Sequence, residues 1–139
     1  MTKFKLKLIA PDGVKFETEA SSASLPTRDG QITILPNHMP LIALLKAGEI
    51  ILTVDSKEHA MATEGGVVEI NNNEVRILAD TAEDVNSLDE LKITEAKKAA
   101  EHRIANAKND AEFVEASAML EKQLTKLSIL TKRKKKYQR

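Results

Sequence analysis

The sequence has 139 residues, of which 42% are hydrophobic and 30% charged, a balance typical of a globular domain and not of a disordered chain. It contains no Cys, which excludes disulfides, thiolate metal sites and a cysteine nucleophile. Aromatic residues make up only 3% and Trp is absent, so stacking on nucleobases is poorly supported and we expect no nucleic-acid partner.

The net charge of zero conceals an asymmetry along the chain. Residues 1–87 carry 8 basic and 13 acidic side chains, a net charge of −5, whereas residues 88–139 carry 13 and 8, a net charge of +5. No apolar run approaches the roughly 18 residues needed to cross a bilayer. The start of the chain alternates and lacks the core of a signal peptide. We therefore expect the protein to reach a membrane only through a partner.

The first 80 or so residues alternate between apolar and polar side chains. Phe4, Leu6 and Leu8 face one side of a strand, while the lysines between them face the other. Pro11-Asp12-Gly13 predicts a turn, because Pro fixes one dihedral angle and Gly accepts a positive φ. Short strands at close spacing predict an antiparallel β-sandwich over residues 1–84. We expect its strands at residues 4–8, 14–18, 24–26, 31–35, 41–45, 49–54, 59–64, 67–70 and 75–79.

Two of the expected breaks between strands fall at glycines. Ala47-Gly48 separates residues 41–45 from 49–54, and Gly65-Gly66 separates 59–64 from 67–70. We interpret Gly65-Gly66 as a tight turn and not as a phosphate-binding loop, because the segment lacks the Lys and the Ser or Thr of a P-loop.

The period changes near Ser87, where a helical pattern begins. Ser87-Leu88-Asp89-Glu90 matches a capping box, in which the Ser87 hydroxyl accepts from the Glu90 amide and the Glu90 side chain reaches back. An apolar stripe that is mostly Ala then recurs every three or four residues. Its members are Ile93, Ala96, Ala100, Ile104 and Ala107.

A second helical stripe follows a break at residues 108–110, where Asp110 is placed to cap the next helix. Two helices with so short a link are expected to pack antiparallel, as a hairpin over residues 88–131. Because hydrophobic stabilisation scales with buried area, an Ala-rich face predicts a loosely held hairpin. The second stripe is mostly Leu and comprises Phe113, Ala116, Leu120, Leu124, Leu127 and Leu130.

A basic tail, residues 132–139, completes the predicted α+β fold of an N-terminal antiparallel β-sandwich followed by a C-terminal antiparallel α-helical hairpin. The tail carries six basic residues and no acid. Three interpretations of the tail stay open: it is a solvated end, it binds the phosphates of nucleic acid or lipid, or it docks to an acidic protein loop.

Residues suited to catalysis or metal binding form no known pattern. His38, His59 and His102 lie far apart in sequence, and HExxH, a P-loop and a nucleophile elbow are all absent. We interpret His38, between Pro36 and Pro40, as a residue that shapes a stiff turn through backbone hydrogen bonds. We expect no catalytic residue, no metal site and no cofactor.

Four segments, residues 30–41, 47–50, 65–70 and 78–83, carry short motifs such as Leu35-Pro36-Asn37-His38-Met39-Pro40. In this order and spacing, followed by a helical hairpin, they resemble the epsilon subunit of bacterial F-type ATP synthase over nearly the whole chain. The resemblance implies a rotor subunit that is not itself an enzyme. Its sandwich would bind the gamma subunit on one side and the ring of membrane c subunits beneath. The implied c-ring contacts are Gln31, Leu35, Pro36, Asn37, His38, Met39 and Pro40.

The resemblance also implies that the hairpin is a regulatory arm. Folded down, the arm would leave rotation free, and extended, it would place basic residues against an acidic loop of the beta subunit and obstruct ATP hydrolysis. The protein would be peripheral, on the cytoplasmic face of the bacterial inner membrane as part of F1. The candidate residues for the beta-subunit contact are Lys122, Lys126, Lys132, Arg133, Lys134, Lys135 and Lys136.

Some members of the family bind regulatory ATP on the folded hairpin. The matching motif here has Lys92 where the family has Arg, which replaces a two-pronged phosphate contact with a point charge. We therefore expect weak ATP binding or none. The residues that would bind ATP are Glu83, Asp89, Lys92, Lys122 and Lys126. The alternative function is an unrelated β-sandwich module that binds other proteins through a helical arm.

Overall fold

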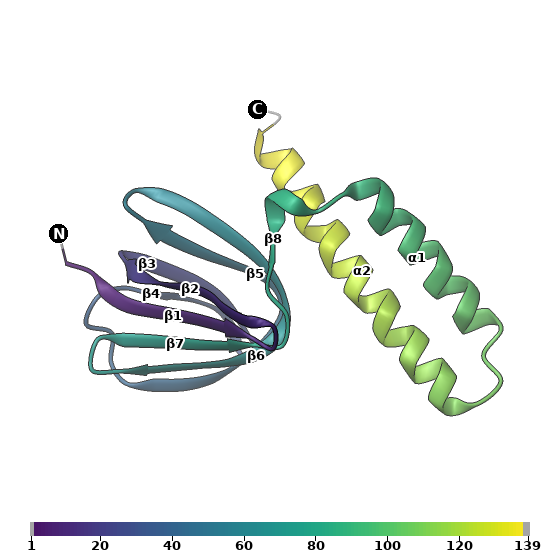
Figure 1. Cartoon of the computed structure of the whole chain (residues 1–139), viewed down its shortest axis with the longest axis horizontal. Helices are drawn as coiled ribbons and strands as arrows, with labels where there is room; N and C mark the ends of the chain where they lie inside the picture. Colours follow the sequence, from purple (N-terminus) through teal and green to yellow (C-terminus); the bar gives the residue numbers. More distant parts are fainter. Residues whose placement is uncertain (1, 138–139) are drawn as a thin grey trace. The chain divides into compact units, whose positions relative to one another are not determined.

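The computed structural model describes residues 2–137, with side chains described from 2 to 134. The chain divides between Asn86 and Ser87 into two compact units. The first unit holds the strands and the second the helices (Figure 1). None of the helices among the described residues is long and apolar enough to span a membrane.

The strands of the first unit form one hydrogen-bonded sheet that curves around its own core (Figure 1). Its order is β2-β1-β7-β6-β5-β3-β4, with β8 paired to β6. The pairs are antiparallel except β1 with β7, which run parallel. The strands are β1 (Phe4–Ala10), β2 (Gly13–Ala20), β3 (Ser22–Thr27), β4 (Gly30–Ile34), β5 (Leu41–Val54), β6 (Lys57–Asn71), β7 (Glu74–Ala79) and β8 (Glu83–Asp84).

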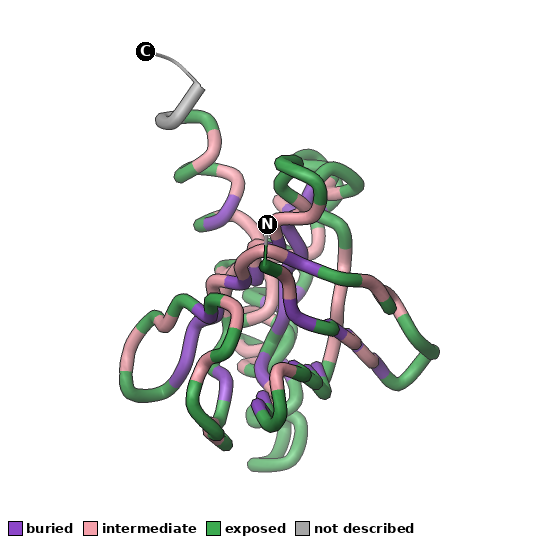
Figure 2. The backbone as a smooth tube through the Cα atoms, turned by 90° about the vertical axis from the view of Figure 1, so that its left-hand side faces the viewer, coloured by how far each residue is buried: buried purple, intermediate pink, exposed green. Residues whose placement is uncertain are grey.

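The core follows from the alternation of side chains along these strands, visible as alternating buried and exposed stretches in Figure 2. In β1, Phe4, Leu6 and Leu8 are buried while the residues between them are not. The same holds for β7, where Val75, Ile77 and Ala79 are buried. The predicted β-sandwich is thereby confirmed.

The expected breaks at Ala47-Gly48 and Gly65-Gly66 were wrong. β5 and β6 each run unbroken through these glycines, and their register continues from Leu41↔Ile70 to Val54↔Lys57. Gly66 has φ of 145°, and a Cβ there would lie 2.1 Å from the Leu78 carbonyl oxygen of β7. Glycine is used here for close approach between strands inside the sheet, so the Gly65-Gly66 turn is corrected to an in-strand position.

The second unit is an antiparallel hairpin of α1 (Glu90–Ala105) and α2 (Asp110–Tyr137) (Figure 1). The predicted cap at Ser87 was wrong, because Ser87 belongs to a 3₁₀ turn, η1 (Val85–Ser87). The N-cap of α1 is Asp89, whose Oδ1 accepts from the amides of Leu91 and Lys92 at 3.0 and 3.3 Å. The next helix begins with Asn109, not Asp110, as its cap, since Asn109 Oδ1 accepts from the Glu112 amide at 2.9 Å.

The two predicted stripes differ in how well they are buried. In the first stripe, Ile93 and Ala100 are buried and the other members are half-buried, including Ala107, which lies beyond the end of α1. On α2, Ala116 is buried, but Phe113 and Leu124 are 51% and 44% exposed, which corrects their assignment to the buried stripe. At 3.6 residues per turn both lie about 60–80° around the helix from Ala116, at the rim of the packed face.

Helix α2 runs on through residues 132–137, where a basic tail was expected. Lys and Arg are good helix formers, and positive charge at a helix C-terminus is favoured by the helix dipole. The basic residues from Lys132 to Lys136 therefore lie on α2, and Arg139 lies outside the described residues.

Candidate functional site

The loop between β4 and β5, residues 35–40, is built around a tight turn. The His38 amide donates to the Leu35 carbonyl at 3.2 Å, and Asn37 at the third position of the turn has φ of 63°. A Pro in the second position and an Asn with positive φ in the third are typical of a type II turn. His38 Nδ1 lies 2.7 Å from the Met39 carbonyl oxygen, a backbone contact of the kind expected for a turn-shaping His.

This turn exposes the side chains on either side of it. Leu35 is 56% and Met39 73% exposed, and Asn37 and Pro40 are exposed as well. Gln31 lies in β4 and is exposed, as is Leu35, which directly follows the strand. β4 is an edge strand of the sheet. The seven residues predicted to contact the c-ring thus lie along one edge strand and the loop that follows it, with Pro36 and His38 half-buried.

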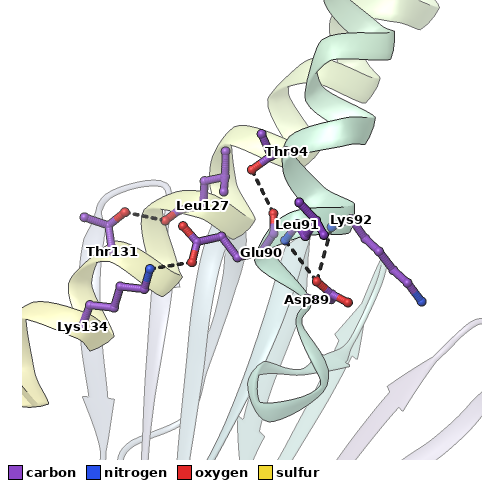
Figure 3. A network of polar contacts seen from close by, with 8 residues as sticks. All are labelled: Asp89, Glu90, Leu91, Lys92, Thr94, Leu127, Thr131 and Lys134. Atoms are coloured by element: carbon purple, nitrogen blue, oxygen red, sulfur yellow. Dashed lines mark hydrogen bonds and ion pairs between the residues drawn. The ribbon is translucent and has the colours of Figure 1, made fainter.

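The basic candidates lie along the second half of α2. Lys122 and Lys126 are half-buried and one helical turn apart, and Lys132 is exposed. Lys134 Nζ forms an ion pair with Glu90 Oε2 of α1 at 2.5 Å, as Figure 3 shows. Arg133 is half-buried and makes an interaction of its own. The side chains of the remaining two candidates, Lys135 and Lys136, lie outside the described residues.

The candidates for ATP binding are divided between the two units, and their assignment stays a prediction. Glu83 lies in β8, and the others lie on the hairpin. The Asp89 carboxylate is engaged as the cap of α1, and Lys92 extends away from the Glu90–Lys134 pair (Figure 3). Among the described residues, no cluster of three or more His, Asp and Glu side chains is placed to hold a metal ion.

The sequence-based prediction missed an apolar row on the outer face of the sheet. Strand register places five aliphatic residues side by side across five strands, on the side away from the core. Leu44, Leu78 and Val14 are 47–52% exposed, and Val67 and Ile9 are half-buried. We call it the outer row: Leu44 of β5, Val67 of β6, Leu78 of β7, Ile9 of β1 and Val14 of β2.

Charged side chains flank the outer row on the same face. Ile42, 72% exposed, adjoins the row on β5, and the positions across from it are Glu69 and Arg76. Beyond them the strands carry cross-strand pairs of opposite charge, including Lys5 with Glu74 at 3.8 Å. A shallow hollow of about 380 Å³ lies over these positions. Its charged lining consists of Lys5, Lys7, Glu17, Glu19, Glu74 and Arg76.

An apolar centre with a rim of charge is the usual anatomy of a protein–protein interface. An exposed row of this kind is unusual on a face that meets only water, where alternation favours polar residues. The signal in the sequence was the presence of aliphatic residues at outward positions of several strands. Recognising the row required the pairing of the strands, which the pattern of each strand alone does not give.

Comparison with known proteins identifies the fold. The family described as "ATP synthase, Delta/Epsilon chain, beta-sandwich domain" matches residues 3–85. The chain is 44% identical to the ATP synthase epsilon chain of Desulfitobacterium hafniense (strain Y51) over 101 residues, 73% of this chain and 76% of the relative. It is 30% identical to the ATP synthase epsilon chain of Bacillus licheniformis over 129 residues, 93% and 98% of the two chains.

A solved structure shows the same fold at low sequence identity. A chain of the Euglena gracilis mitochondrial ATP synthase, from a cryo-EM structure of OSCP, F1 and the c-ring, superimposes with a TM-score of 0.80. The two chains are 18% identical, and the match covers 94% of this chain and 82% of the other.

The fold and the matching domain together define a subunit of the delta/epsilon class of ATP synthase. The chain belongs to the ATP synthase epsilon chain family. The resemblance inferred from its motifs is thereby confirmed, and an unrelated β-sandwich module is excluded.

Proposed function

We propose that this chain works as a non-catalytic subunit of the central stalk of F1Fo ATP synthase. It couples proton-driven rotation of the c-ring to ATP synthesis through gamma, and its C-terminal helices inhibit ATP hydrolysis when they extend. Family membership supports this role. In this role the protein is peripheral, on the cytoplasmic face of the bacterial inner membrane as part of F1.

The observation that carries the proposal is the outer row. Five aliphatic side chains cross five strands on a face whose remaining positions are largely charged. Burial of apolar area is the main favourable term in association, and a broad sheet face suits a partner that lies along it. We assign this face to the gamma subunit, the shaft that must turn together with the sandwich.

The c-ring contact is assigned to the 35–40 loop and Gln31. Leu35 and Met39 are the large exposed hydrophobic side chains of the loop, and Gln31 supplies an amide that donates and accepts hydrogen bonds. The two assigned surfaces involve different residues and are therefore separable by mutation.

The inhibitory role is assigned to the hairpin. Its two helices leave several large apolar side chains exposed, which supports a second surface on which the arm rests when extended. In the inhibited state the basic positions of α2 meet the beta subunit. Regulatory ATP remains expected to bind weakly or not at all. The exposed apolar side chains of the hairpin are Leu91, Phe113, Val114, Met119 and Leu124.

Substituting Leu78 with Glu tests the gamma assignment. Leu78 is 47% exposed and lies in the middle of the outer row, so a charge there disrupts docking at little cost to folding. We expect the affinity for purified gamma to fall at least tenfold, with an unchanged thermal midpoint of the isolated chain. Met39→Glu is the matched control, because Met39 is 73% exposed in the 35–40 loop, which is assigned to the c-ring and not to gamma. Unchanged gamma affinity in Leu78→Glu would exclude the outer row as the gamma site.

Deletion of Leu88–Arg139 in the assembled complex tests the inhibitory role. The first unit retains its own core, so we expect assembly with gamma and the ring to survive. ATP hydrolysis is expected to rise. Unchanged hydrolysis removes the inhibitory role and leaves the stalk role standing.

A further inference from the structure

The side chain of Asn73 connects two segments that are far apart in the sequence. Its Nδ2 donates to the carbonyl of Lys3 at 2.9 Å, and its Oδ1 accepts from the amide of Asn37 at 2.7 Å. Its own carbonyl accepts from the Lys5 amide at 3.1 Å. One residue in the turn between β6 and β7 thus joins the start of β1 to the middle of the 35–40 loop.

The chemistry of this position favours Asn over other residues. Asn73 has φ of 59°, in the left-handed region, where Asn and Gly are the common residues. Gly would satisfy the backbone but has no side chain to bond. Asp would accept from Asn37 but, when ionised, has no donor for the Lys3 carbonyl. Asn alone of these three provides the conformation, the donor and the acceptor together.

The anchor on the β1 side is itself fixed. Lys3 Nζ donates to Asp55 Oδ1 in the turn between β5 and β6 at 3.0 Å. The Lys3 segment is therefore held from two sides, by Asp55 through its side chain and by Asn73 through its carbonyl. A loop attached to this segment through Asn73 takes its position from the sheet and not from its own conformation alone.

The loop has little else among its described residues to fix its direction. The His38 amide bonds back to Leu35, and the His38 ring contacts the neighbouring Met39 carbonyl. Both contacts shape the turn but are internal to it. The bond from Asn37 to Asn73 spans 36 positions and ties the turn to the sheet.

We propose that Asn73 is a positioning residue for the 35–40 loop, which it holds in the orientation that presents Leu35 and Met39 to the c-ring. This inference rests on the proposed function, in which that loop contacts the ring. A contact that transmits torque requires a loop that moves with the sandwich, and preorganisation lowers the entropic cost of docking. Asn73 touches no partner in this arrangement and acts through the Asn37 amide.

Three variants of the full chain separate this role from general stability. Asn73→Gly keeps the left-handed backbone and removes both side-chain bonds. Asn73→Asp keeps the acceptor for Asn37 and loses the donor to Lys3. Asn72→Gly is the control, because Asn72 is exposed in the same turn with φ of 49°.

Amide hydrogen exchange of the isolated chain is the first measurement. In Asn73→Gly we expect the Asn37 amide to exchange about three- to tenfold faster, the range that the loss of one hydrogen bond supports. Leu6 and Leu8 in the core strand are expected to keep their protection. Asn73→Asp is expected to restore protection of Asn37, and Asn72→Gly to leave it unchanged. Equal loss of protection at Asn37, Leu6 and Leu8 would overturn the proposal, since it indicates a structural role only.

Affinity for purified c-ring in nanodiscs is the second measurement. We expect Asn73→Gly to weaken binding about three- to tenfold and Asn73→Asp to recover most of it. A looser loop with unchanged ring affinity would overturn the positioning role. Met39→Glu tests the ring contact itself: if it leaves ring affinity unchanged, the proposed loop contact fails, whatever the Asn73 variants do.

Discussion

Glu90 and Lys134 join the open end of the helical hairpin, 44 residues apart in sequence and 2.5 Å apart between Oε2 and Nζ (Figure 3). At the closed end, Arg103 of α1 pairs with Glu115 of α2 at 3.7 Å. An exposed ion pair thus links the two helices at each end of the hairpin, and the first helix packs through a face rich in Ala. Lys134 is also among the residues proposed to meet the beta subunit, so this ion pair would compete with that proposed contact.

Glu90→Gln is expected to loosen the open end of the hairpin. Both side chains of the pair are more than half exposed, so its contribution is only about 0.2–1 kcal/mol and decreases with salt. We expect up to about fivefold faster amide exchange in residues 127–134 at low ionic strength, and little difference at 1 M salt.

A double-mutant cycle isolates this pair from the dipole of α1. Lys134→Gln should have the same effect as Glu90→Gln, and the double variant should be no worse than either. Glu95→Gln is the control, because Glu95 is exposed on the same helix and has no ion-pair partner among the described residues. Additive effects of the two substitutions would show that the pair does not hold the hairpin.

Asp89→Ala is expected to fray the first turn of α1. The Asp89 carboxylate accepts from two amides that have no partner within the helix, and loss of such a cap costs about 1 kcal/mol. Asn is as good a cap as Asp, so Asp89→Asn should preserve the turn. Exchange rates of the Leu91 and Lys92 amides measure the effect, and equal rates in Asp89→Ala and the unsubstituted chain would contradict this cap assignment.

The position of this cap shows where local patterns reach their limit. Ser87 and Asp89 are both good N-cap residues, and Ser87 has the Glu three positions later that completes a capping box. Ser87 belongs to η1, so α1 begins only at Glu90 and Asp89 is its N-cap. The helices and most strands were predictable because their apolar periods are local. Their ends were not, because neighbouring structure selects among several suitable residues.

The outer row and the Asn73 connection could not be predicted for a different reason. Ile9, Val67 and Leu78 become neighbours only through the pairing of β1, β6 and β7, and that pairing includes a parallel contact between β1 and β7. Likewise, nothing near Asn73 in sequence indicates a bond to Asn37. By contrast, the exposure of Leu35 and Met39 could be predicted, because the Pro and Asn residues near them are typical of an exposed turn.

The ion pair between Lys15 and Asp12, at the turn between β1 and β2, predicts that the stability of the fold depends on pH. The hydrogen bond from Lys15 Nζ to Asp12 lowers the pKa of the Asp12 carboxyl below its usual value. Because the folded pKa is depressed, this pair stabilises the fold above the unfolded pKa, and that contribution is lost as the pH falls through the folded pKa. Lys15→Met should raise the Asp12 pKa towards its usual value in a carboxyl-carbon NMR titration. An unshifted titration would mean that the pair does not persist in solution.

Gly66→Ala is expected to destabilise the sandwich more than the same change at Gly13. Both glycines have a positive φ, 145° and 130°, so each substitution carries backbone strain of roughly 1–3 kcal/mol. A Cβ at Gly13 meets nothing within 4 Å, whereas at Gly66 it would lie 2.1 Å from the Leu78 carbonyl oxygen and 2.9 Å from Ala79 Cα. Those atoms belong to the β7 backbone, which cannot shift without disturbing its pairing with β6 and β1.

The difference between the two variants therefore measures the close approach of the strands rather than the dihedral angle. Urea denaturation of the first unit is expected to give a loss of about 3 kcal/mol or more for Gly66→Ala and about 1 kcal/mol for Gly13→Ala. Because Leu78 is also the centre of the outer row, a displaced β7 should weaken binding to gamma in the folded fraction of Gly66→Ala. Equal losses of stability in the two variants would mean that β6 relaxes around the added methyl group, and gamma binding should then be unaffected.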